Sequence, residues 1–63
     1  MTKFEELENM KAVVDYHYSK FKKEGSFETE VAWNRSLSQL EDMLEDSYSS
    51  LTEEEQEIVN NWF

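Results

Sequence analysis

The sequence predicts an all-α fold: an antiparallel helical hairpin plus a short third helix, together a small three-helix bundle. Three observations predict it. The 63 residues include no Pro and one Gly, so few positions favour loops. Apolar residues recur at steps of three and four in three successive segments, which is the spacing of one helix face. No segment alternates as a strand does, and we expect residues 1–63 to form one compact domain.

The first predicted helix covers residues 3–24. Thr2 is expected to cap it, because Glu5 stands three residues later in the spacing of a capping box. The lysines within residues 20–23 suit the negative end of the helix dipole, and Gly25 favours the left-handed conformation that ends a helix. The apolar stripe of this helix consists of Phe4, Leu7, Met10, Val14, Tyr18 and Phe21.

The second predicted helix covers residues 27–48 and follows Ser26, a residue type that favours the N-cap position. Its clearest apolar stripe consists of Trp33, Leu37, Leu40 and Leu44. Its opposite face carries the carboxylates of Glu41, Asp42, Glu45 and Asp46.

The third predicted helix covers residues 53–63. Thr52 and Glu55 have the spacing of a second capping box, and three glutamates in the first turn favour the positive end of the dipole. A helix this short is marginal alone, so we expect it to lie on the hairpin. Its apolar residues, in pairs four apart, are Ile58 with Trp62 and Val59 with Phe63.

The sequence lacks the residues that most cofactor or metal sites need. There is no Cys, which excludes disulfides and thiolate zinc sites. The twelve positions from Asp42 to Glu53 outline a calcium loop, but Leu44 occupies a ligand position and Ser47 stands where the turn needs Gly. We expect no metal and no cofactor.

Catalysis is not expected either, and we predict no catalytic residue. His17 is the single His and stands beside aromatic residues, and no nucleophile elbow or Gly-rich phosphate loop occurs. No signal peptide and no apolar run of membrane-spanning length is evident, so we expect a cytoplasmic protein that does not bind membranes.

Charge is distributed unevenly along the chain. Residues 1–35 carry seven acidic and six basic side chains, whereas residues 36–63 carry eight acidic and no basic ones. Glu41 with Glu45, and Asp42 with Asp46, are like-charged pairs one helical turn apart, and each pair costs a few tenths of a kcal/mol. Because one Lys would remove this cost, the pattern indicates selection for charge itself.

Such a surface is suited to imitate a nucleic-acid backbone. Carboxylates one turn apart lie about 6 Å from each other, comparable to neighbouring phosphates, and a groove that neutralises phosphates would accept them. The expected partner is a protein with a basic, nucleic-acid-binding surface, whereas direct binding of nucleic acid is disfavoured by the net charge of −9. The alternative is a solvated surface that only keeps the protein soluble.

The residues expected to bind this partner are Glu41, Asp42, Glu45, Asp46, Tyr48, Glu53, Glu54 and Glu57. Tyr48 is included, and Trp62 considered, because Tyr and Trp are enriched at the energetic centres of interfaces. In size, acidity and lack of Cys the chain resembles small phage proteins that inhibit host enzymes, among them DNA mimics and anti-CRISPR inhibitors. That resemblance implies a phage-encoded inhibitor acting in the host-cell cytoplasm.

Two other hypotheses remain open. The stretch Leu-Ser-Gln-Leu-Glu-Asp at residues 37–42 resembles the Ser-Gln-Glu-Leu-Asp signature of the sporulation aspartyl-phosphate phosphatases, with Glu and Leu exchanged. The resemblance implies a helical-hairpin regulator whose functional residues are Gln39 and Asp42. The third hypothesis is a structural subunit or homodimer. Its self-interface would consist of Trp33, Trp62 and Phe63.

Overall fold

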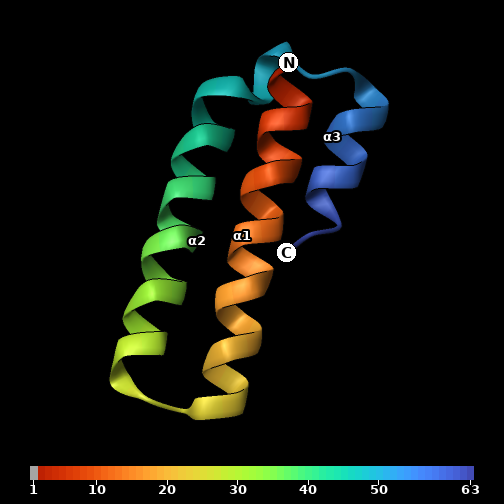
Figure 1. The fold of residues 1–63 in the computed structure, drawn as a ribbon. Helices are drawn as coiled ribbons and strands as arrows, with labels where there is room; N and C mark the ends of the chain where they lie inside the picture. Colours follow the sequence, from red (N-terminus) through yellow and green to blue (C-terminus); the bar gives the residue numbers. More distant parts are fainter. Residues whose placement is uncertain (1) are drawn as a thin grey trace.

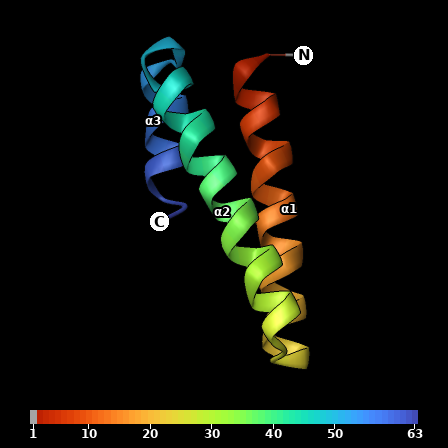
Figure 2. The ribbon, with the colours of Figure 1, turned by 90° about the vertical axis from the view of Figure 1, so that its left-hand side faces the viewer.

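A computed structural model describes residues 2–63 and confirms the predicted all-α fold (Figure 1). Helix α1 spans Lys3–Glu24 and helix α2 spans Phe27–Ser47, and the two pack side by side in opposite directions. A single 3₁₀ turn, η1, spans Tyr48–Ser50, and helix α3 spans Glu53–Asn60. Figures 1 and 2 show α3 alongside the half of the hairpin farthest from the α1–α2 turn.

Both predicted capping boxes are present. The Thr2 hydroxyl accepts the backbone N–H of Glu5 at 3.1 Å, and the Glu5 carboxylate accepts the backbone N–H of Thr2 at 3.5 Å. At α3, the Thr52 hydroxyl accepts the Glu55 N–H at 3.2 Å, and the Glu55 carboxylate accepts the Thr52 N–H at 2.9 Å. Each box satisfies backbone donors that the first turn of a helix leaves free.

The turn of the hairpin is formed as predicted by one Gly and one N-cap. Gly25 has a φ of 64°, in the left-handed region, and its N–H donates to the carbonyl of Phe21 at 2.7 Å. Ser26 then caps α2 by accepting the N–H of Thr29 at 3.3 Å. Because only two residues join the helices, α1 and α2 must lie antiparallel.

The second helix ends one residue before its predicted end, and the third ends three residues before its predicted end. Regular α2 ends at Ser47, and Tyr48 begins the 3₁₀ turn, in which the Leu51 N–H donates to the Tyr48 carbonyl at 3.1 Å. Helix α3 ends at Asn60 rather than at residue 63. Its last turn tightens, with the Trp62 N–H donating to the Val59 carbonyl at 3.0 Å. This turn brings the Trp62 ring onto Phe4, at 6.3 Å between ring centroids.

The core lies mainly where α3 covers the hairpin. Its buried apolar residues are Leu7, Val14, Leu40, Leu51 and Val59. Both tryptophans pack partly buried against this core. Trp33 also stacks on Phe21, at 5.4 Å between ring centroids. In the part of the chain that the structure describes, no helix is long and apolar enough to cross a membrane.

Candidate protein-binding site

All residues predicted to bind a partner lie at the surface. Each is classed as exposed: Glu41, Asp42, Glu45, Asp46, Tyr48, Glu53, Glu54 and Glu57. Glu55, which was not predicted to bind, is half-buried and occupied by its capping box. The structure therefore separates a glutamate used in folding from carboxylates that are free to meet a partner.

No basic side chain neutralises the predicted acidic surface. Within residues 2–63, the one ion pair joins Lys11 Nζ to the carboxylate of Asp15 at 2.8 Å, and both residues lie on α1. The seven predicted carboxylates of α2 and α3 make no ion pair there. A basic partner would therefore not have to replace ion pairs that these carboxylates already make within residues 2–63.

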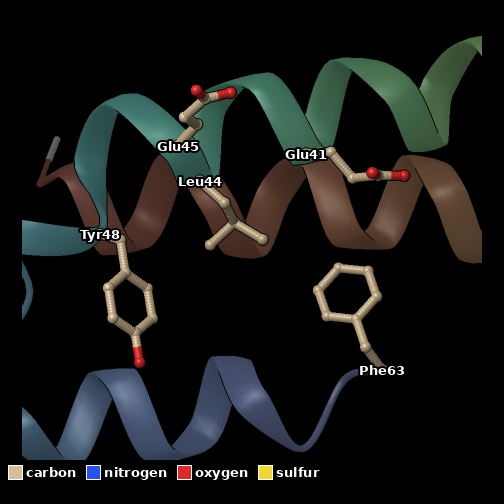
Figure 3. A pocket seen from close by; sticks show the side chains of 5 residues that line it. All are labelled: Glu41, Leu44, Glu45, Tyr48 and Phe63. Atoms are coloured by element: carbon tan, nitrogen blue, oxygen red, sulfur yellow. The ribbon is translucent and has the colours of Figure 1, made fainter.

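An apolar groove of about 520 Å³ runs between the C-terminal half of α2 and the segment that follows α3. Figure 3 shows the rings of Tyr48 and Phe63 on either side of the Leu44 side chain. Glu41 and Glu45, from the same helix as Leu44, complete the lining at its edge. Figure 3 shows their carboxylates pointing away from the two rings, towards solvent. The site thus combines an aliphatic floor, two aromatic walls and two carboxylates.

Tyr48 is held in this position by α3. The Asn60 side-chain amide donates to the Tyr48 hydroxyl at 3.1 Å, and the Gln56 amide donates to the Tyr48 carbonyl at 2.9 Å. The ring therefore crosses from the end of α2 to α3, as Figure 3 shows. A side chain fixed before binding loses less conformational entropy when a partner arrives.

The structure brings together some of the predicted site residues and separates others. Glu41 and Glu45 of α2 and Tyr48, the first residue of η1, are three or four residues apart and share one groove. The predicted residues that do not line it are Asp42, Asp46, Glu53, Glu54 and Glu57. Two groups result: a pair of carboxylates beside aromatic rings, and a wider set of exposed carboxylates on α2 and α3.

Two features of the site were missed from the sequence. Leu44 was assigned only to the apolar stripe, and Phe63 was expected at a self-interface with Trp33 and Trp62, so neither was predicted to lie beside the acidic partner-binding residues. The hairpin also adds three exposed glutamates of α1 to the acidic half of the molecule: Glu5, Glu6 and Glu8. The contribution of these glutamates could have been inferred from the predicted antiparallel hairpin, because that arrangement places the start of α1 beside the end of α2.

The residues expected for a phosphatase-like regulator lie apart from the grooves, whereas those expected for a homodimer share one. Gln39 and Asp42 are both exposed on α2 and line none of the grooves described here. Trp33, Trp62 and Phe63, by contrast, come together in a second groove of about 320 Å³ between α1, α2 and the end of the chain. No group of three or more His, Asp or Glu side chains within residues 2–63 is placed to hold a metal ion.

Comparison of the chain with protein-family models, with curated proteins and with solved structures gives no match.

Proposed function

We propose that this protein is an inhibitor that binds another protein and covers the basic surface with which that protein holds nucleic acid. The observation that supports this most is an exposed set of carboxylates that make no ion pair within residues 2–63, next to an exposed apolar groove. Carboxylates one helical turn apart offer a basic surface a charge spacing similar to that of phosphates. The groove adds the apolar contact that electrostatics alone does not give.

The proposal extends to biological context through the resemblance in size and charge. Small acidic phage proteins include DNA mimics and anti-CRISPR inhibitors, and this chain would act in the same way in the cytoplasm of a host cell. Its action needs no cofactor and no bond-breaking step, because occupying the surface is enough to exclude the nucleic acid. Affinity should fall steeply with salt, since the contacts depend on charge.

A pull-down from bacterial lysate tests the proposal. The tagged protein is loaded with lysate and eluted in parallel by increasing salt and by duplex DNA. We expect a nucleic-acid-binding protein to be retained and to be released by both. A retained partner that neither salt nor DNA releases would contradict the proposal.

The control is a charge-neutralised variant that keeps the capping glutamates intact. It carries E41Q, D42N, E45Q, D46N, E53Q, E54Q and E57Q. Far-UV circular dichroism should show nearly unchanged helix content, because Glu55 still caps α3 and the relief of the like-charged pairs on α2 offsets the dipole contribution lost with Glu53 and Glu54. The variant should retain no partner that DNA can release, whereas single substitutions should each reduce retention only in part, because the effect is cumulative.

A homodimer is the second candidate, supported by the groove that Trp33, Trp62 and Phe63 share. Lys11 and Asp15 border this groove and neutralise each other, so charge does not oppose a second copy there. Sedimentation equilibrium from micromolar to millimolar protein tests the candidate. A mass that rises towards twice the monomer value supports the dimer, and a constant monomer mass rules it out.

A further inference from the structure

We propose that the groove between Tyr48 and Phe63 receives an arginine side chain of the partner, with its guanidinium against Glu41 and Glu45. This inference rests on the proposed function, because it names the chemical group of a basic partner that the groove would recognise. The groove would then bind one particular side chain, whereas the other exposed carboxylates would attract the partner by long-range electrostatics.

The walls of the groove suit the shape of arginine. Leu44 gives an aliphatic floor between two aromatic rings, which matches a side chain with an apolar stem. The guanidinium is planar and more weakly hydrated than an ammonium, so it stacks on aromatic faces at a low cost of desolvation. A Lys ammonium is a compact, strongly hydrated charge and would gain less from the same walls.

The charges beside the groove favour a cation. Glu41 and Glu45 lie one helical turn apart on α2, and no basic residue lines the groove. A guanidinium beside them, with both Glu side chains turned towards it, would relieve their mutual repulsion and donate hydrogen bonds to both carboxylates. An apolar side chain would leave this repulsion in place, and an anion would increase it. Charge complementarity thus selects arginine from the side chains that the walls would fit.

The groove is also prepared for binding. Tyr48 is 36% exposed and its hydroxyl is bonded to Asn60, so one wall is fixed by two helices. Phe63 is 66% exposed, which leaves the opposite wall open to contact. A ring this exposed contributes little to the folded core, so an arginine stem that covers it buries apolar surface that folding leaves in water.

The test is an NMR titration with small probes. The ¹⁵N-labelled protein is titrated with N-acetyl-arginine-N-methylamide and, separately, with the citrulline analogue, which has nearly the same shape and no charge. We expect the arginine probe to shift the amide signals of Leu44, Tyr48 and Phe63 in a saturable way with a millimolar dissociation constant. The citrulline probe should bind at least about tenfold more weakly, and the lysine analogue about threefold to tenfold more weakly.

Matched variants localise the effect. E41Q/E45Q should weaken arginine binding about fivefold or more, whereas D42N/D46N, an exposed pair with the same spacing outside the groove, should change it less than about twofold. F63A should abolish saturable binding. F27A removes a ring that is 78% exposed and lies outside this groove, and it should leave binding unchanged.

Three results would overturn the inference. In the first, E41Q/E45Q and D42N/D46N weaken arginine binding equally. In the second, the arginine and citrulline probes bind with the same affinity. In the third, the amide signals of the groove shift with protein concentration and not with added probe, which would place a second copy in the groove. The pull-down remains independent of all three. If the pull-down retains a partner that DNA releases, the proposed function stands even when arginine does not bind the groove. If arginine binds the groove but no such partner is retained, the arginine site stands and the proposed function is rejected.

Discussion

At the scale of single residues, Tyr48 links the fold to the candidate site. It begins the 3₁₀ turn after α2, its carbonyl accepts the Gln56 amide, and its hydroxyl meets Asn60. The same ring forms one wall of the groove. Contacts that dock α3 therefore also set the shape of the surface offered to a partner.

Replacing Tyr48 by Phe should weaken the docking of α3, while the Phe ring still lines the groove. Loss of the hydrogen bond to Asn60 should lower the free energy of unfolding by roughly 0.5–1 kcal/mol, measured by urea denaturation. Y16F is the matched control, because Tyr16 is 58% exposed and its hydroxyl makes no hydrogen bond within residues 2–63. An equal loss in the two variants would show that the bond to Asn60 contributes nothing.

The residue contacts that could be predicted from the sequence are the local ones. Thr52 and Glu55 are three residues apart, so a capping box depends only on the helix that they begin. Tyr48 and Asn60 are twelve residues apart and meet only because α3 folds back. No spacing rule predicts that pair, and for the same reason no rule placed Phe63 opposite Leu44.

At the scale of elements, α3 is held by few buried groups. Val59 is its single buried residue and is 2% exposed, and the half-buried Trp62 adds a stacking contact just beyond its end. An eight-residue helix is unstable by itself in water, so its stability comes from this docking.

Replacing Val59 by Ala should therefore undock α3 more than it unfolds the hairpin. The lost burial is worth about 2 kcal/mol. Hydrogen exchange should become faster for the amides of α3 while those in the middle of α1 and α2 keep most of their protection. I58A is the control, since Ile58 neighbours Val59 in the same helix but is 46% exposed. Equal exchange rates in the two variants would mean that Val59 does not hold α3.

The like-charged pair on α2 gives a second prediction at this scale. E45K places a Lys one turn after Glu41, the favourable order for an ion pair within a helix. At low salt it should raise the free energy of unfolding by roughly 0.5 kcal/mol, and E45Q, which only removes repulsion, should raise it by less. The gain should shrink in about 0.5 M NaCl, because salt screens exposed charges. No gain at low salt would contradict the cost assigned to this pair.

The starts of the helices were predictable and two of their ends were not. Each helix begins after a Ser or Thr that caps its first turn, and all three caps were found where predicted. The end at Gly25 was also predictable because Gly marks it. Neither α2 nor α3 ends at a Gly, so their ends depend on tertiary contacts such as the stacking of Trp62 on Phe4.

At the scale of the whole molecule, folding concentrates the charge further. Along the sequence, residues 36–63 hold eight of the fifteen acidic side chains. In the fold, the start of α1 joins them, so residues 2–12 and 38–63 carry eleven acidic side chains and two lysines. The remaining half, around the α1–α2 turn, carries four of each sign. The molecule has a neutral end and a strongly acidic end, and the groove lined by Leu44 and Phe63 belongs to the acidic one.

This segregation suits a protein that approaches a basic surface with one end. A strongly acidic end orients the molecule as it approaches a basic surface, and the groove then adds short-range contact. Only part of this could be predicted from the sequence: the excess of carboxylates is a matter of composition, whereas the contribution of Glu5, Glu6 and Glu8 requires the antiparallel packing.

Whether this protein occupies the nucleic-acid site of its partner can be measured by competition, with the partner retained in the pull-down. A fluorescent duplex is bound to that partner, and its anisotropy is followed as this protein is added. We expect complete displacement by the wild-type protein and little displacement by the charge-neutralised variant. If the duplex stays bound while this protein also binds, in a ternary complex, the acidic surface does not occupy the nucleic-acid site and the account is contradicted.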